Sequence, residues 1–339
     1  MSNEKGVYLQ TNDAEKNEIV AFRRGDGGEL VKVGTYETGG RGTGKPHLPS
    51  QSSIVVTDDG SVLVTNGRSD DVSLFEAADG ELRLVDRAAA GKTPTSLAER
   101  DGLVYVLGNG DASIGGFRIA DGKLEPLADS TRALSAPDAD PAQISFSPDG
   151  RTLVVTERGT NAITTFALDE SGYAQEATTI RAAGETPYGF DFTRDGAVVV
   201  TEAFGGAIGK AAASSYRLAD GSLEPVSGSV GDTRSEVCWA AVTRDDRFVY
   251  VTNFGDGTIS SYSIGPDGAL ELANPVAAAT RLGEAGVRDE AISRDGEFLY
   301  ALDADARRVH GWRIGADGSL DEIGSWDGLP ATVAGLAAG

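Results

Sequence analysis

Histidine, the side chain best suited to acid–base chemistry at neutral pH, is scarce in this sequence. The chain contains only two histidines, His47 and His310. His47 lies in the segment GKPHLPS, where it is a candidate general acid or base because imidazole titrates close to neutrality. The alternative is a loop histidine that only packs or faces solvent. His310 falls within an apolar, strand-like segment, and we interpret it as structural.

One position recurs in the repeats: the last residue of a strand-like segment that ends in VTN or a similar triplet. In some copies a carboxylate replaces the amide at this position. Glu157 and Glu202 stand where other copies have Asn, which usually caps a turn through backbone hydrogen bonds. We take Glu202 and Glu157 as catalytic candidates, since crowding raises a carboxylate pKa, with salt bridges to Arg158 or Arg288 as the alternative. Asn253 and Asp303, at the same position in other copies, are substrate-binding candidates. All residues at this position are predicted to form a polar ring at one mouth of a central channel: Asn12, Asn66, Asn109, Glu157, Glu202, Asn253 and Asp303.

Three consecutive charged residues, Arg288, Asp289 and Glu290, open another strand-like segment. Strand alternation should direct Arg288 and Glu290 to one side and Asp289 to the other. We take Arg288 as a residue that orients a carboxylate or phosphate during catalysis, because a guanidinium binds such groups through two hydrogen bonds. Asp289 and Glu290 are substrate-binding candidates. An ion pair between neighbouring repeats is the alternative.

Arg41 is a second candidate for binding an anion, in the glycine-rich segment GGRGTGK. This segment does not match GxxxxGK[ST], and no strand-to-helix pattern surrounds it. A nucleotide-binding P-loop is therefore rejected.

The remaining candidates stand at or near the starts of other strand-like segments. Glu236, like His47, is an alternate to Glu202 and Glu157 for catalysis. Tyr188 and Trp239 are suited to stacking on a sugar or unsaturated ring, or else to core packing. Gln143 and Arg158 complete the predicted substrate-binding set. A Ca²⁺ or Mg²⁺ site built from Glu157, Glu202, Asp303 and Glu236 is a minor alternative, and we expect neither a metal nor another cofactor.

The elements that must position these residues form a repeat of four strand-like segments. Examples are ISFSPDGRTLVVTERGTNAITTFALDESG (144–172) and AAVTRDDRFVYVTNFGDGTISSYSIGPDGAL (240–270). Turns between the first and second segments centre on Gly60, Gly102, Gly150, Gly196, Asp246 and Gly296, which are 42, 48, 46, 50 and 50 residues apart. This spacing is typical of the blades of a β-propeller, and Asp-Gly suits turns that need positive φ.

Six complete repeats and two fragments predict one all-β domain, a seven-bladed propeller of four-stranded antiparallel blades. The fragment 6–36 lacks a first strand and 329–339 resembles an isolated one, so the C-terminal strand should join the N-terminal strands and close the ring. The predicted blades of this 1–339 domain are 6–36 with 329–339, 51–88, 94–128, 141–181, 187–228, 236–276 and 287–324.

One face of the predicted ring should carry the functional site. The Asp-Gly turns on the other face are short, whereas the loops that lead into first strands are long and irregular, and sites usually lie in such loops. These loops are 37–52, 128–143, 227–239 and 278–290.

Composition limits the partners. A formal net charge of −22 argues against nucleic acid and against anionic membranes, because both need a basic surface. Cys238 is the only cysteine, which excludes an internal disulfide, and we expect it to act as a small buried apolar residue. The start MSNEKGVYLQTND lacks a signal peptide pattern and no stretch is long and apolar enough to span a membrane, so we expect a cytoplasmic protein.

The segments SPDGRTLVVTE, RDDRFVYVTN and ISSYSIGPDGAL resemble the YVTN-type repeats of the lactonase family of propellers. That family includes 6-phosphogluconolactonase of the bacterial propeller type and carboxymuconate-lactonizing enzymes. The resemblance implies the seven-bladed fold and lactone chemistry by a channel-facing His, Arg and Glu set. Family first strands often open with Pro-His-His, whereas the openings here contain no histidine: Pro141-Ala142-Gln143, Pro187-Tyr188-Gly189, Val237-Cys238-Trp239 and Val287-Arg288-Asp289.

The function that the resemblance implies is a lactonase-like enzyme, acting by hydrolysis or by lactonization and isomerization. Its partner would be a small polar, anionic metabolite bound at the channel mouth. The alternative is a non-catalytic propeller that binds a small ligand or a partner protein on the long-loop face. A metal-dependent lactonase similar to the gluconolactonase propellers is the third hypothesis.

Overall fold

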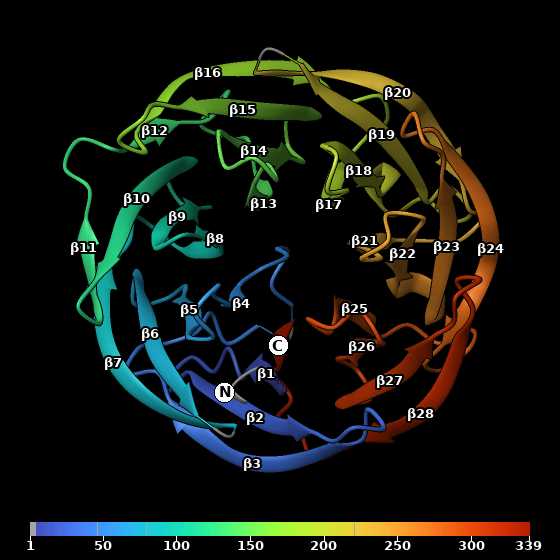
Figure 1. The fold of residues 1–339 in the computed structure, drawn as a ribbon, viewed down its shortest axis with the longest axis horizontal. Coiled ribbons are helices and arrows are strands. Elements are labelled where there is room, and N and C mark those ends of the chain that lie inside the picture. Colours follow the sequence, from blue (N-terminus) through green and yellow to red (C-terminus); the bar gives the residue numbers. More distant parts are fainter. Residues whose placement is uncertain (1–4, 46, 79, 220) are drawn as a thin grey trace.

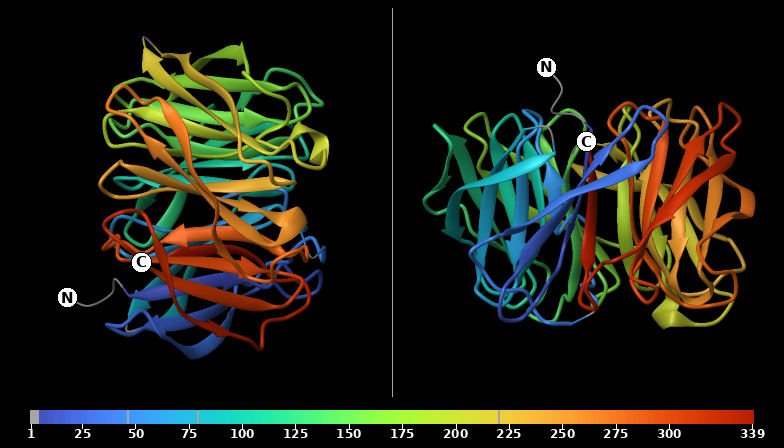
Figure 2. Two further views of the ribbon diagram at one scale, coloured as in Figure 1. Left: turned by 90° about the vertical axis from the view of Figure 1, so that its right-hand side faces the viewer. Right: turned by 90° about the horizontal axis from the view of Figure 1, so that it is seen from below.

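The computed structural model describes residues 5–45, 47–78, 80–219 and 221–339, which form seven antiparallel sheets arranged radially around a central channel (Figure 1). The all-β propeller predicted from the repeats is confirmed. Strands run between the two faces of the ring, which Figure 2 shows edge-on. No described helix is long or apolar enough to cross a membrane.

The first three blades follow the predicted order of strands. Blade 1 contains β29 (Ala334–Ala338), β1 (Gly6–Gln10), β2 (Glu18–Arg24) and β3 (Leu30–Glu37). Blade 2 contains β4 (Ile54–Val56), β5 (Val62–Asn66), β6 (Asp71–Ala78) and β7 (Glu81–Ala89). Blade 3 contains β8 (Pro94–Arg100), β9 (Leu103–Gly108), β10 (Ser113–Ala120), β11 (Lys123–Pro126) and the short β12 (Arg132–Ala133). Because β12 also pairs with β10, this blade extends beyond the predicted end at residue 128.

The other four blades are regular meanders. Blade 4 contains β13 (Pro141–Phe146), β14 (Thr152–Glu157), β15 (Ala162–Leu168) and β16 (Ala174–Arg181), and blade 5 contains β17 (Pro187–Phe192), β18 (Ala197–Glu202), β19 (Ala212–Ala219) and β20 (Ser222–Gly231). Blade 6 contains β21 (Val237–Val242), β22 (Phe248–Asn253), β23 (Thr258–Ile264) and β24 (Leu270–Ala279), and blade 7 contains β25 (Val287–Ile292), β26 (Phe298–Asp303), β27 (Arg308–Ile314) and β28 (Leu320–Trp326). Short 3₁₀ turns, Phe204–Gly206 and Phe254–Asp256, follow β18 and β22.

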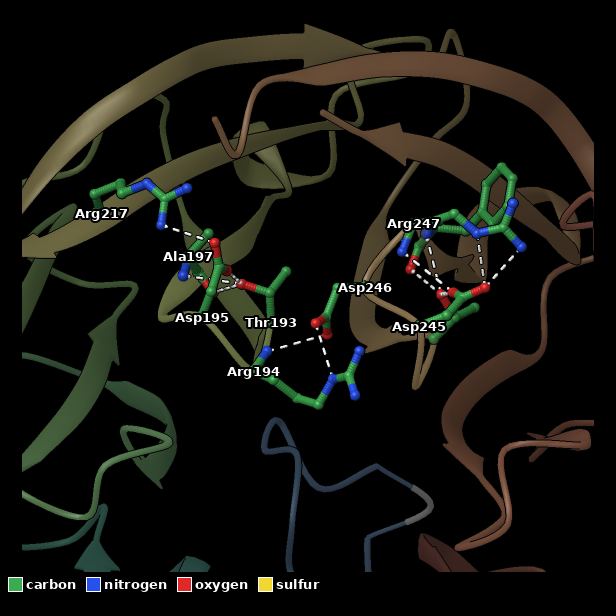
Figure 3. Close-up of polar contacts among 10 residues, drawn as sticks. Thr193, Arg194, Asp195, Ala197, Arg217, Asp245, Asp246 and Arg247 are labelled. Atoms are coloured by element: carbon green, nitrogen blue, oxygen red, sulfur yellow. Dashed lines mark hydrogen bonds and ion pairs between the residues drawn. The ribbon is translucent and has the colours of Figure 1, made fainter. Parts of the chain in front are cut away.

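The turns between first and second strands are fixed by side chains of the repeat. In blade 5 the Thr193 hydroxyl donates to the Asp195 carboxylate at 2.6 Å, and Gly196 adopts a φ of 90° (Figure 3). A left-handed backbone is easy for glycine, which explains its place in the repeat. Blade 6 has Asp246 there, at a φ of 61°, and its carboxylate accepts hydrogen bonds from Arg194 of blade 5. We call the surface formed by these turns the turn face.

The last strand closes the ring as predicted. β29 pairs antiparallel with β1, for example Leu9 with Leu336, which joins segments from opposite ends of the chain in one sheet. Leu336 and Val333 also pack with Phe298 in the core between blades 1 and 7. The closing strand therefore contributes backbone hydrogen bonds to one blade and apolar contacts to the next.

Second strands are the most completely buried strands of the blades. All residues of β14, β18 and β26 are buried, and the clusters they join lie between adjacent blades. Such burial stabilises the fold by about 25 cal/mol per Å² of apolar surface removed from water. The ring is therefore rigid. It holds the long loops, which lie at the end opposite the turn face. We call this end the loop face.

Candidate functional site

The acidic residues at the ends of second strands lie inside their blades and do not face the channel. Glu202 is 0% exposed, and its carboxylate accepts hydrogen bonds from the Gly184 backbone N–H at 2.7 Å and from the hydroxyls of Ser214 and Ser229 at 2.5 and 2.6 Å. Burial raises the pKa of Glu202, while the hydrogen bonds from both serines act in the opposite direction. All of these partners belong to blade 5 or to the loop that leads into it. The side chain thus joins segments within its blade.

Glu157 has an equivalent arrangement in blade 4. Its carboxylate accepts hydrogen bonds from Ser135, from Thr160 at 2.8 Å and from Thr164 at 2.6 Å. No salt bridge to Arg158 or Arg288 forms, because Arg158 instead pairs with Asp140 at 2.5 Å. The predicted polar ring is therefore wrong as a channel feature, although its members do share one position in the blades.

Asn253 and Asp303 are also buried within blades. The Asn253 amide donates to Ser260 at 2.8 Å, and Asp303 forms a 3.0 Å ion pair with Arg281. Burial acts to raise the pKa of Asp303, but the hydrogen bond from Arg281 and the other bonds outweigh it, so the pKa lies below its usual value. The structure does not bring either residue to a cavity.

A cavity of about 270 Å³ opens on the loop face, and we call it the loop-side cavity. Its walls come from the starts of three first strands, from both 3₁₀ turns and from the loop before β4. The lining residues are His47, Thr186, Tyr188, Ala203, Gly205, Gly206, Glu236, Val237, Cys238, Phe254 and Arg288. Four of the predicted site residues therefore meet here, although they are far apart in the sequence: His47, Tyr188, Glu236 and Arg288.

His47 reaches this cavity because the segment before β4 extends toward the centre of the ring (Figure 1). An Arg288 N–H of blade 7 approaches His47 Nδ1 at 2.6 Å, and the Tyr188 hydroxyl of blade 5 lies 3.2 Å from Nε2. Since arginine only donates, Nδ1 must be the acceptor and Nε2 must carry the proton. That proton is then donated to the Tyr188 oxygen.

The imidazole is neutral in this setting. Burial, and then the positive charges of Arg288 and Arg158, lower the pKa of His47 to about 3. A group with so low a pKa is a poor proton acceptor at neutral pH. The structure therefore favours His47 as a residue that positions Arg288 and Tyr188.

Tyr188 has one hydrogen-bonding group left for a ligand. Its oxygen accepts from His47 and from Arg158, whose Nη1 lies 3.4 Å away. Both lone pairs are then used, so the hydroxyl proton is free to donate into the cavity. Burial raises the pKa of the Tyr188 phenol, which keeps this proton in place at neutral pH.

Trp239 supports Tyr188 from behind rather than lining the cavity. The two rings lie 4.7 Å apart, and Trp239 is almost fully buried. On the other side, the Arg158 guanidinium lies 5.0 Å from the Tyr188 ring centroid. These contacts fix the orientation of the phenol.

Arg288 is held over the ring of Phe254, with 3.7 Å between the guanidinium carbon and the ring centroid. One N–H is used by His47, and the buried Nε has no partner among the described residues. A stacked guanidinium with unused N–H groups at a cavity is well suited to a carboxylate, a phosphate or a developing oxyanion.

Glu236 supplies a carboxylate at the same cavity. It adopts a φ of 56°, and its side chain forms no hydrogen bond or ion pair with any described residue. The neighbouring Cys238 thiol is buried, which raises its pKa to about 12, so it is not a nucleophile at neutral pH. Glu236 is thus the group at this cavity that is available to accept a proton from water.

The other predicted residues lie elsewhere. Arg41 is exposed on the loop face and does not line the loop-side cavity. Gln143 and Glu290 line a separate cavity nearer the turn face. Asp289 points toward blade 1 and accepts a 3.1 Å hydrogen bond from the Gly335 N–H. Arg288 and Glu290, which strand alternation placed on one side, line different cavities, and the pairing of β25 with β26 shifts register between Val287 and Glu290.

A metal site was a minor alternative, and the geometry gives it no support. In residues 5–45, 47–78, 80–219 and 221–339, no group of three or more His, Cys, Asp or Glu side chains could hold a metal ion. Glu157, Glu202 and Asp303 in particular have their oxygens engaged in three different blades.

Sequence reasoning missed the ring on which Arg288 stacks at this cavity, and it missed the partner of Gln51, which lines the other cavity of the channel. Phe254 follows a second strand in a copy of the repeat that ends VTNFG, and nothing local indicates that it stacks on Arg288. The Gln51 amide both donates to and accepts from the backbone of Ala240, 189 residues away, at 2.9 and 3.3 Å. A partner so distant in sequence has no local signal.

The fold and this cavity define a class of protein: a seven-bladed propeller with ionisable side chains at one end of its channel. The sequence profile described as "Lactonase, 7-bladed beta-propeller" matches residues 98–204 and 203–332, so the chain belongs to the lactonase family. A search of curated proteins gave no match.

Solved structures agree in fold. A provisionally assigned 6-phosphogluconolactonase from Bacteroides fragilis is 19% identical, with a TM-score of 0.76 over 99% of this chain and 98% of that one. One from Bacteroides uniformis, also provisionally assigned, is 21% identical, with a TM-score of 0.75 over 98% and 99%. A periplasmic gluconolactonase from Pseudomonas aeruginosa is 16% identical, with a TM-score of 0.72 over 97% and 98%. Likeness at this identity establishes the fold alone.

Proposed function

We propose that the protein is a lactonase-like enzyme that acts on a small anionic lactone in the loop-side cavity. The observation that carries this proposal is the meeting of Arg288, Tyr188 and Glu236, from three blades, around one cavity. Membership of the lactonase family supports the reaction class. The similar proteins named for 6-phosphogluconolactone and gluconolactone chemistry favour a sugar-derived substrate.

Each residue has a chemical role in lactone hydrolysis. Glu236 takes a proton from water, whose oxygen attacks the lactone carbonyl carbon. The free Tyr188 O–H and an Arg288 N–H stabilise the oxyanion that develops, which is the contribution of an oxyanion hole. The ring C–O bond then breaks, and the proton held by Glu236 passes to the departing ring oxygen. In the reverse direction, the same groups would catalyse lactonization.

An anionic group on the substrate would lie near Arg288 and toward Arg158, which contacts the Tyr188 hydroxyl and ring. The Arg158 guanidinium is mostly buried and pairs with Asp140 at 2.5 Å. A carboxylate or phosphate near Arg288 and Arg158 would offset the two positive charges that lower the pKa of His47. Binding of an anion should therefore raise the pKa of His47 toward its usual value.

The test is turnover of a panel of γ- and δ-lactones, with and without a carboxylate or phosphate, measured by the acid released. We expect Tyr188→Phe and Glu236→Gln to lower kcat by about 10²-fold or more, since each removes a group that acts on the transition state. Glu185→Gln, an exposed glutamate on the same face, is the matched control. Unchanged kcat in both variants would reject this site.

Saturable binding without turnover of any lactone would instead favour the non-catalytic propeller. The cytoplasmic location stays part of the proposal, and the periplasmic location of the Pseudomonas aeruginosa protein makes fractionation of the native host a useful check.

A further inference from the structure

The channel contains a second and larger cavity, of about 620 Å³, which opens toward the turn face, and we call it the turn-side cavity. It shares no lining residue with the loop-side cavity. Gln51 lines the turn-side cavity and donates a 2.9 Å hydrogen bond to the Ala240 carbonyl of blade 6. The two cavities are therefore formed by different residues, although both involve the first strands of blades 5, 6 and 7.

The inner end of this cavity is acidic. Glu290 lines it and is only 4% exposed, yet both of its carboxylate oxygens lack a hydrogen-bond partner among the described residues. Asp191 lies close by and accepts hydrogen bonds from the backbone N–H groups of Val242 and Phe192, each at 2.8 Å. A buried carboxyl group without a partner is costly unless a ligand or solvent satisfies it.

The rim of the cavity is basic. Arg194 and Arg244 follow the first strands of blades 5 and 6, and both line the cavity. Arg194 is paired with Asp246, toward which it points in Figure 3, at 2.9 Å. Arg244 forms no hydrogen bond or ion pair with any described residue, and its charge only partly opposes the rise in the pKa of Asp191 that burial causes. A guanidinium available to an anion thus lies at the opening.

Both apolar and polar side chains line the rest of this cavity. Val56, Val242 and Ile292 line the walls of the cavity. These three side chains can contact methylene groups, while Gln51, Ser145 and Thr243 on the same walls offer hydrogen-bonding groups.

We propose that the turn-side cavity is a second binding site, for a linear molecule that carries a protonated amine at one end and a carboxylate at the other. The amine binds Glu290 and Asp191, the carboxylate binds Arg244, and the chain between them contacts the apolar side chains of the walls. This proposal does not depend on the lactonase activity, because the turn-side cavity and the loop-side cavity are lined by different residues.

The probe is 6-aminohexanoate, added to the intact protein and followed by titration calorimetry. We expect saturable binding that is weaker by about tenfold or more for hexanoate, which lacks the amine, and for hexylamine, which lacks the carboxylate. Arg244→Gln should weaken binding of 6-aminohexanoate to a similar extent. Arg294→Gln is the matched control: it occupies the same position in blade 7, bonds to Asp58 and does not line the cavity.

Proton release identifies the amine site. Burial, and then the charges of Asp191 and Asp289, raise the pKa of Glu290 well above its usual value, so an arriving ammonium should displace a proton. The binding heat should then depend on the ionisation heat of the buffer, less so in Glu290→Gln. Absence of binding by 6-aminohexanoate, equal binding of hexanoate, or equal effects of Arg244→Gln and Arg294→Gln would overturn the proposal even if Glu290→Gln fails to fold.

Discussion

His47 shows how burial changes the role that residue type suggests. Free imidazole is the usual acid–base group at neutral pH, but here it is neutral and lies between an arginine and a tyrosine. Its two nitrogens differ in hydrogen bonding, since Nδ1 accepts a hydrogen bond from Arg288 and Nε2 donates one to Tyr188. An amide side chain also has one acceptor and one donor, so glutamine is the closest uncharged substitute.

We therefore expect His47→Gln to keep most of the activity and His47→Ala to lose it by about 10-fold or more. The pKa of His47 is lowered to about 3, so its titration should not affect kcat/KM near pH 6.5. The wild type and His47→Gln should therefore have pH profiles of the same shape in that range. Kinetics of both variants between pH 5 and 8 test this. A glutamine variant as inactive as the alanine variant, together with loss of a step near pH 6.5, would make His47 the general base.

At the scale of the strand, one position has been adapted in every blade to hold the loops. Glu202 connects the end of β18 to Gly184 in the preceding loop and to Ser214 and Ser229 on β19 and β20. Glu157 connects β14 in the same way to Ser135 and Thr164. The glutamate side chain is one methylene longer than asparagine, which explains Glu157 and Glu202 at this position without a catalytic role.

Glu202→Ala should lower the free energy of unfolding by about 1–3 kcal/mol, because it leaves the buried Gly184 N–H and two hydroxyls unpaired. Urea unfolding measures this loss. Glu224→Gln, an exposed glutamate on β20, is the control and should change little. A variant with wild-type stability that has lost lactone turnover would return Glu202 to the list of catalytic residues.

The sequence predicts where these residues lie along the strands, but not the direction of their side chains. Glu202 and Ala203 are neighbours, yet Ala203 lines the loop-side cavity and Glu202 is enclosed in the blade. His47, Arg288, Tyr188 and Glu236 could be selected by residue type and by their place at strand starts. The contacts of Phe254 and Gln51 could not, because both depend on blades that meet only in the closed ring.

The closing strand is the element on which the whole ring depends. Removal of 329–339 would free the edge of β1 and expose the core between blades 1 and 7. We expect a lower melting temperature and a less cooperative transition, with partial recovery when a peptide of the same sequence is added. A melting curve equal to that of the intact chain would contradict this prediction.

The fold was predictable because its signals are local and repeated. Each Asp-Gly turn is fixed by neighbours within four residues, such as Thr193, Asp195 and Gly196, so the blade spacing is visible in the sequence. Closure could be inferred because 6–36 lacks the strand that 329–339 supplies. Cavities at the two ends of the channel had no such signal, since their walls come from strands of several blades.

Buried acids near the channel axis affect the stability of the whole molecule. Burial raises the pKa of Asp289 to about 7 and that of Asp191 to about 6, against a model-peptide value near 3.8 in the unfolded chain. The folded state then holds more protons than the unfolded state between these values. Their contribution to stability is fully present below about pH 3.8 and is lost as the pH rises through 6 and 7.

Asp289→Asn removes this dependence at one site while keeping an acceptor for the Gly335 N–H. We expect the variant to gain stability relative to the wild type as the pH rises from 5 to 8, by about 1.4 kcal/mol per pH unit at most, with little further change above the pKa. Free energies of unfolding in urea at each pH, in high salt to screen the net charge of −22, measure the difference. Parallel curves for the two proteins would show that Asp289 is already ionised in the folded state at pH 5.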